Sequence, residues 1–188
     1  MCHIAGSHLL DPASGEYTLP YVDWVVGAAA ADVAVVRLVE RSQGLMVAAG
    51  NPLGIAGLAD ICRGGVRYVN RQRGAGTRVL LDVMLGQLGI APSSIEGYAR
   101  EEPTHLAVAA AIASGRADAG LGIMAAAQVF GLDFVPLATE PYDLVVAPGV
   151  LESPQLAPLW ALLRSDRFKA SVDELGGYSA KEMGRRVR

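Results

Sequence analysis

The chain has 188 residues, of which 52% are hydrophobic and 19% are charged, and its formal net charge at pH 7 is -3. This much apolar sequence excludes a mostly disordered chain, and the slightly acidic balance excludes a general electrostatic attraction to nucleic acid. Two cysteines, Cys2 and Cys62, are too few for a disulfide framework or a four-cysteine zinc site.

Residues 1–65 differ in pattern from the rest of the chain. They do not open with a basic segment followed by an apolar one, so we expect no secretory signal and a cytoplasmic protein. A helix is predicted over residues 21–31, and two strands over residues 33–39 and 44–48. Residues 44–59 carry no charge but hold four glycines and a proline, so we expect no membrane-spanning helix there.

Residues 66–147 alternate short β-branched runs with longer helical runs, which is typical of parallel βαβ units. The clearest helix covers residues 77–88, whose leucines recur at helical spacing. The chain is therefore predicted to be an α/β protein. The other expected elements are strands over 66–70, 95–98 and 119–123, helices over 105–114, 124–130, 155–164 and 167–174, and extended segments over 134–137 and 142–147.

This pattern predicts two lobes. One lobe consists of residues 51–137, and the other is formed jointly by residues 1–50 and 138–188. The chain is expected to cross between the lobes near residues 48–52 and again within residues 137–146.

The turn of residues 70–78, between a predicted strand and a predicted helix, is the strongest candidate for a binding site. Gly74 and Gly76 permit a tight turn, and Thr77 lies where a first-turn hydroxyl would. A helix start offers N–H donors and partial positive charge to an anion. The alternative is a solvated basic turn with an ordinary cap, and the spacing fits neither a dinucleotide fingerprint nor a P-loop. Three basic residues add charge to the turn: Arg71, Arg73 and Arg78. Thr77 and Arg78 are expected at a solvent-facing helix start.

Two further residues are candidates for ligand contact. Thr104 precedes a predicted helix, where it either donates to a ligand or simply caps the helix. Tyr142 lies at the expected return crossing, where it either closes on a ligand or packs at a strand edge.

No catalytic or metal site is predicted. Ser7, His8 and Asp11 are too close in sequence for a triad assembled across a fold, and no nucleophile elbow is present. His3 and Glu16 add no convincing metal-ligand spacing to these residues. We therefore expect no enzymatic activity, no cofactor and no bound metal.

Several short sequence motifs along the chain carry a family resemblance. They are GSHLLD at 6–11 with GEY at 15–17, RSQGL at 41–45 with GNP at 50–52, VNRQRGAGTR at 69–78, THLAVA at 104–109, ADAGLGI at 117–123, and GLDF at 131–134 with YDL at 142–144. Together they resemble the periplasmic-binding-protein-like domain found fused to molybdopterin biosynthesis proteins and to helix-turn-helix or excisionase-type regulators. That domain is similar in fold to the type II substrate-binding proteins of molybdate and tungstate transporters.

The resemblance implies a type II periplasmic-binding-protein-like α/β fold of two lobes that close on a small oxyanion, with molybdate or tungstate preferred. It also implies that the first βα units of lobe 1 are lacking, and with them half of the site. Ala75 stands where a serine is common in the family. Together with Arg71 from the basic turn, the residues expected to face the ligand are Ser7, Gly74, Ala75, Gly76, Thr77, Arg78, Thr104 and Tyr142.

The expected function is a ligand-binding or sensing domain linked to molybdenum metabolism or its regulation. Its expected partners are the oxyanion and a fused or separate DNA-binding or biosynthetic domain, with no contact to nucleic acid or membrane through this segment. One alternative is an accessory domain of a molybdopterin biosynthesis enzyme. Another is a truncated assembly module that does not bind ligand and whose uncovered sheet edge would favour homo-oligomers.

Overall fold

The computed structural model describes residues 3–27 and 32–188 and divides the chain into two compact units. Unit 1 comprises Met1–Arg41 and Thr139–Arg188, and unit 2 comprises Ser42–Ala138. The chain passes from unit 1 to unit 2 inside strand β2 (Ala34–Val47) and returns inside strand β6 (Asp133–Val146). The first passage therefore lies within a strand, earlier than the turn at residues 48–52 where the sequence analysis expected it.

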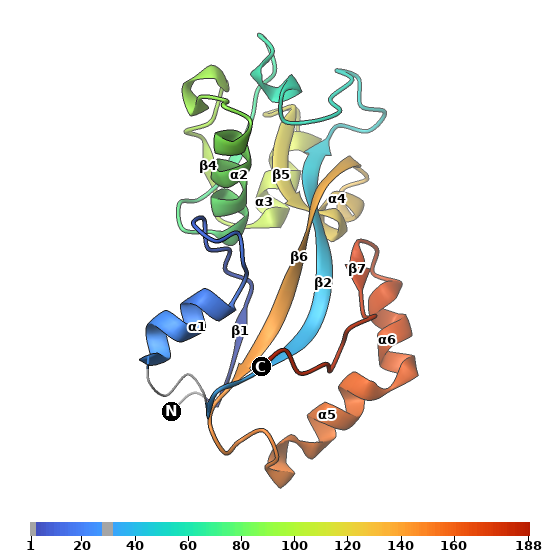
Figure 1. Cartoon of the computed structure of the whole chain (residues 1–188). Helices are drawn as coiled ribbons and strands as arrows, with labels where there is room; N and C mark the ends of the chain where they lie inside the picture. Colours follow the sequence, from blue (N-terminus) through green and yellow to red (C-terminus); the bar gives the residue numbers. More distant parts are fainter. Residues whose placement is uncertain (1–2, 28–31) are drawn as a thin grey trace. The chain divides into compact units, whose positions relative to one another are not determined.

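Strands β2 and β6 are each continuous (Figure 1). The sequence analysis divided each of them into two segments, which was wrong. Polar residues suggested the breaks, but the structure gives these side chains partners: Arg41 pairs with Glu140, and the Gln43 amide bonds the Thr77 hydroxyl. The sheet order is β1-β6-β2-β5, with β7 on β2, and β3 and β4 form a separate two-stranded sheet.

Unit 1 contains strands β1 (Ile4–Ser7) and β7 (Tyr178–Ser179), and its described residues also form three α-helices. Strand β1 pairs antiparallel with β6, so that Ser7 lies opposite Asp143. Helix α1 begins earlier than predicted, and residues 28–31 of the predicted helix lie outside the described residues. The two C-terminal helices were predicted within two residues. The helices are α1 (Leu19–Val26), α5 (Ala157–Arg164) and α6 (Asp166–Asp173), with a 3-10 turn η4 (Pro154–Leu156) before α5.

Unit 2 contains the βα units that the sequence predicted. Strand β5 (Ala119–Ile123) pairs antiparallel with β2, whereas the short strands β3 (Asn70–Arg71) and β4 (Glu101–Glu102) are parallel. Its core gathers Met46, Val69 and the buried face of the alanine-rich α3. The helices are α2 (Gly76–Gln87), α3 (His105–Ala113) and α4 (Met124–Val129), with 3-10 turns η2 (Asp60–Cys62) and η3 (Pro92–Ser94).

Two predicted strands of unit 2 were placed wrongly. Within residues 66–70, Tyr68 forms only a single parallel bridge to Ala119, and β3 begins at Asn70. Residues 95–98 form a turn instead of a strand, because Gly97 adopts φ +90°. Only glycine fits at this position, since a side chain would meet the carbonyl of Tyr68. The strand that pairs with β3 follows at Glu101.

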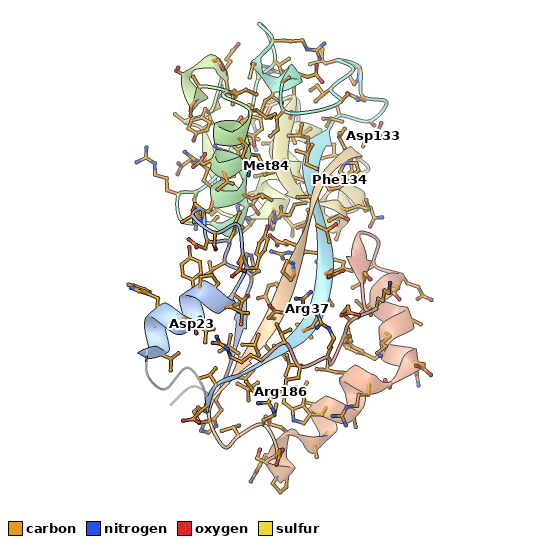
Figure 2. All side chains as sticks on the ribbon, in the orientation of Figure 1. Asp23, Arg37, Met84, Asp133, Phe134 and Arg186 are labelled. Carbon is orange, nitrogen blue, oxygen red and sulfur yellow. The ribbon has the colours of Figure 1, made fainter. Side chains whose placement is uncertain are left out.

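A close contact explains one glycine of β2. A Cβ at Gly44 would lie 2.2 Å from the Val135 carbonyl and 2.7 Å from the ring of Phe134. Figure 2 labels Phe134 near the start of β6. A glycine at position 44 therefore lets β6 approach β2 closely within unit 2. No helix in the described ranges is long and apolar enough to cross a membrane.

Candidate functional site

The start of α2 in unit 2 has the geometry expected of an anion-binding turn. Gly74 has φ +82°, and the following Ala75 is the extended N-cap of the helix. An alanine has no side-chain oxygen with which to cap, so no side chain bonds the first N–H groups of the helix from that position. The turn therefore presents the positive end of a helix with an uncapped start.

The N-cap residue of α3, Thr104, caps the start of the helix with its side chain. The Thr104 hydroxyl accepts a hydrogen bond from the Ala107 backbone N–H at 3.0 Å. This confirms the capping interpretation of Thr104 from the sequence. The hydroxyl proton can still be donated, because the cap uses only an acceptor position of the oxygen.

The pairing of β3 with β4 brings the two helix starts to one edge. Asn70 lies opposite Glu101 in parallel register, and α2 and α3 each begin a few residues after the carboxyl end of their strand. Arg71 Nη2 donates to the Pro103 carbonyl at 3.0 Å, directly before Thr104. The unit thus unites Arg71, the turn of residues 74–78 and Thr104, an arrangement that α/β proteins commonly use for ligands.

Thr77 faces the interior of unit 2. Its side chain belongs to a residue that is only 2% exposed, and its hydroxyl lies 3.0 Å from Nε2 of the buried Gln43. The sequence analysis expected Thr77 at a solvent-facing position, which was wrong. The partner on β2 that draws the hydroxyl inward is remote in the sequence.

Arg78 is also buried, contrary to the sequence expectation. Its Nε donates to both carboxylate oxygens of Asp82 at 3.1 Å, and its Nη1 donates to Glu101 at 3.1 Å. The guanidinium carbon lies 4.3 Å from the ring centroid of Tyr98. Two carboxylates therefore balance the charge of Arg78.

The two candidates in unit 1 lie on paired strands. Ser7 ends β1, and its carbonyl accepts a hydrogen bond from the Thr18 hydroxyl at 3.4 Å. Tyr142 lies on β6, and a Cβ at Gly6 would meet its ring at 2.7 Å. Glycine at position 6 thus lets the tyrosine ring lie against β1.

Sequence reasoning missed the polar groups around Tyr142. The His8 ring stacks on Tyr142 with centroids 5.0 Å apart, and the Arg41 guanidinium lies 5.2 Å from the same ring. Arg41 forms a buried ion pair with Glu140. The available signal was a charged residue between two apolar runs, because a buried charge requires a partner.

Tyr17 completes this group from the loop before α1. Burial and the Glu140 carboxylate raise the pKa of Tyr17 to about 12, and Arg41 opposes this effect. The hydroxyl of Tyr17 is therefore protonated at neutral pH and available as a donor. Over residues 3–27 and 32–188, no group of three or more histidine, cysteine or acidic residues could hold a metal ion.

The fold is that of a PBP-like ligand-binding domain, and the chain belongs to the PBP superfamily domain family, whose model matches residues 1–164. It is 38% identical over 184 residues to the uncharacterized protein YvgK of Bacillus subtilis (strain 168). That alignment covers 98% of this chain and 58% of YvgK, so the chain spans less than two thirds of this relative.

Solved structures share the fold. PEB3 from Campylobacter jejuni superposes with a TM-score of 0.62 at 20% identity, covering 95% of this chain and 79% of that chain. The substrate-binding domain of a molybdenum ABC transporter from Clostridium difficile gives a TM-score of 0.63 at 15% identity, covering 95% and 76%. These similarities establish the α/β fold of type II periplasmic binding proteins for this chain.

Proposed function

We propose that this chain binds a small oxyanion, with molybdate or tungstate preferred, as a sensor or carrier linked to molybdenum metabolism or its regulation. It acts in the cytoplasm without catalysing a reaction, and it passes the bound state to a fused or separate DNA-binding or biosynthetic domain. Membership of the PBP superfamily supports the binding role. The choice of molybdate is supported by one structural neighbour named for molybdenum transport.

The observation that carries the proposal is the uncapped start of α2 beside the start of α3 in unit 2. Backbone N–H groups at a helix start point along the axis and suit the oxygens of a tetrahedral oxyanion. Arg71 is anchored to the Pro103 carbonyl between these two starts. The donors are therefore held by the backbone, which favours a compact anion.

A solved structure shows that this fold accommodates an anionic ligand. PEB3 has been crystallised with L-phospholactate, which carries a phosphate and a carboxylate. That observation belongs to PEB3, but it supports an oxyanion as the ligand class here. The identity of the ion is part of the proposal. Molybdate, tungstate, sulfate and phosphate differ in size and charge, and the site would select among them by these two properties.

The test is thermal unfolding of the purified chain with molybdate, tungstate, sulfate or phosphate, and with sodium chloride at matched ionic strength. A ligand at a hundred times its dissociation constant adds about 2.7 kcal/mol of stability, which corresponds to a Tm increase of several degrees. We expect this increase with molybdate and tungstate and little with sulfate. A chain that unfolds cooperatively at the same Tm with all four anions would contradict the proposal.

A further inference from the structure

Unit 1 contains a cavity of its own, separate from the anion turn of unit 2. We call it the tail cavity, because the C-terminal tail (residues 184–188) forms one side of it. Its volume is about 330 Å³, which lies within the range of small-molecule sites. Every residue that lines it belongs to unit 1, so the cavity is complete within that unit. The lining includes three apolar and three charged residues: Val36, Leu151 and Trp160, and Glu152, Arg164 and Arg186.

The C-terminal tail is fixed along strand β2 beside this cavity. The Val187 N–H donates to the Val35 carbonyl at 2.7 Å. Directly before it, Arg186 lies opposite Val36 in an antiparallel bridge. Residues that lie opposite each other in such a pair project to the same face. Backbone pairing therefore holds the side chain of Arg186, which Figure 2 labels, on the face of β2 where Val36 lines the cavity.

The apolar side of the tail cavity is held in place by Trp160 of α5. Its indole N–H donates to the Leu151 carbonyl at 2.6 Å, which joins α5 to the segment before η4. The indole has no other polar group, so it offers only apolar surface to a ligand. Val36 is 4% exposed and adds a buried aliphatic side chain. This side of the cavity therefore suits the apolar body of a small ligand.

Arg186 differs from the other two arginines of the tail in its pairing. Arg185 forms an ion pair with Glu182. Arg188 forms an ion pair with Asp23. Arg186 donates from Nε to the Arg188 carbonyl at 2.7 Å, but it has no carboxylate partner within residues 3–27 and 32–188. The tail arginine that lines the cavity is therefore the one whose charge no side chain of the described chain balances.

The other two charged residues of the cavity, Arg164 and Glu152, also form no ion pair with any described residue. Arg164 is the last residue of α5, where a positive charge is favourable beside the helix dipole. Arg186 lies outside any helix, so the dipole does not account for it. Two arginines and one glutamate give the cavity the net charge of a single cation. A monoanion balances this charge, whereas an oxyanion with two charges exceeds it.

We propose that the tail cavity binds a small monocarboxylate with an apolar body. The carboxylate pairs with the guanidinium groups of Arg164 and Arg186, which supply charge-assisted hydrogen bonds. The apolar body packs against Trp160 and Val36. This second site lies in unit 1 and takes a different class of ligand. It therefore goes beyond the proposed function, which concerns an oxyanion in unit 2, and does not depend on it.

The experiment is a fluorescence titration of the full chain with 3-phenylpropionate at pH 7, where its carboxylate is ionised. The chain has two tryptophans, and Trp24 is 82% exposed on α1. Trp24→Phe is therefore the background for every measurement, so that Trp160 is the indole that responds. Two further probes separate the parts of the ligand. The alcohol 3-phenylpropanol has the same body without charge, and acetate has the carboxylate without the body.

Two variants on this background each remove one positive charge from the cavity: Arg164→Gln and Arg186→Gln. Both residues are exposed, so the variants should keep the fold, which thermal unfolding checks. The matched control is Arg167→Gln, at an exposed arginine of α6 that does not line the cavity. The control should bind 3-phenylpropionate as the background chain does, and each cavity variant should bind it at least about tenfold more weakly.

The two smaller probes and molybdate complete the test. We expect 3-phenylpropanol and acetate to bind at least about tenfold more weakly than 3-phenylpropionate, and excess sodium molybdate to leave its affinity unchanged. The inference would be overturned if Trp160 emission showed no saturable change, if either cavity variant kept its affinity, or if the alcohol or acetate bound equally well. Each of these outcomes would leave the proposed function intact, because that function rests on the start of α2. Competition between molybdate and 3-phenylpropionate would also overturn the inference, because the two ligands would then share one site.

Discussion

The hydroxyl of Thr77 lies 3.0 Å from the side-chain nitrogen and 3.2 Å from the side-chain oxygen of Gln43, with both residues buried in unit 2. This pair joins the first turn of α2 to strand β2. A polar pair that satisfies itself inside a core stabilises only modestly, but either partner alone is costly. The first turn of the candidate anion site is therefore tied to the core of its unit.

The Gln43 and Thr77 pair should show strong coupling in a double-mutant cycle. We expect Thr77→Val to lower the free energy of unfolding by about 1 to 3 kcal/mol, because it leaves a buried amide without its partner. Adding Gln43→Leu should restore part of this loss, since no polar group then remains unpaired. Urea unfolding of the two single variants and the double variant measures the effect. Strictly additive losses would show that the two side chains do not interact.

A carboxylate at the start of α2 should raise the stability of the chain and weaken its binding of molybdate. Ala75→Asp supplies the missing N-cap and should raise the free energy of unfolding by about 0.5 to 2 kcal/mol. The same negative charge should weaken molybdate binding at least tenfold. Ala75→Ser is the matched control, because it also caps the helix but carries no charge. Calorimetric titration measures binding, and equal affinities of the two variants would remove the α2 start from the site.

Arg78 and Arg73 lie in the same turn region but should differ in their effect on stability. Arg78 is buried between Asp82 and Glu101, so Arg78→Met should cost about 1 to 3 kcal/mol. The Arg73 side chain is 87% exposed, and Arg73→Met should change stability by less than about 0.5 kcal/mol. Urea unfolding of both variants tests this. Equal losses would contradict the burial of Arg78.

Local sequence patterns predicted most helices of this fold, because a helix depends on spacing and caps within about ten residues. Helices α2 and α3 and strand β5 appear where the pattern placed them, and Thr104 caps α3 as one interpretation held. The short strands could not be placed as well. Strand β3 has only two residues, and its position depends on its pairing with β4, far along the chain.

The candidate site was only partly predictable for the same reason. The sequence indicated the anion turn, because glycines, basic residues and a helix start are neighbours there. It could not show that Thr77 turns inward, because its partner Gln43 is 34 positions away. It also missed the pair of Arg41 and Glu140, which are 99 positions apart. The polar residues that seemed to break two strands have paired side chains within continuous strands.

Leu81, in the middle of α2, and Leu88, the C-cap of the same helix, should differ sharply in their contribution to stability. Leu81 is fully buried, so Leu81→Ala should cost about 2 to 5 kcal/mol through the cavity that it leaves. Leu88 follows the helical pattern of the sequence but is 60% exposed, and Leu88→Ala should cost less than about 1 kcal/mol. Chemical unfolding compares the two variants. Similar losses would mean that α2 buries a different face.

Asp118 should contribute stability that depends on pH. It accepts hydrogen bonds from Nε, Nη2 and the backbone N–H of Arg67 at 3.0, 2.6 and 2.8 Å. The Arg67 side chain lowers the pKa of this carboxyl below its usual 3.8. The unfolded chain therefore binds a proton more readily at this position, so this stabilisation is present above the unfolded pKa and is lost as pH falls through the folded value.

Asp118→Asn should accordingly lower the free energy of unfolding at pH 7 and have progressively less effect as the pH falls below 3.8. We expect a loss of about 1 kcal/mol at pH 7, because the Arg67 side chain is 42% exposed and solvent screens the pair. Asp133→Asn is the control, at an exposed aspartate that Figure 2 labels. Urea unfolding at pH 7, 5, 4 and 3 measures the difference. A gap between wild type and Asp118→Asn that is as large at pH 3 as at pH 7 would show that the ionised carboxylate is not what Arg67 stabilises.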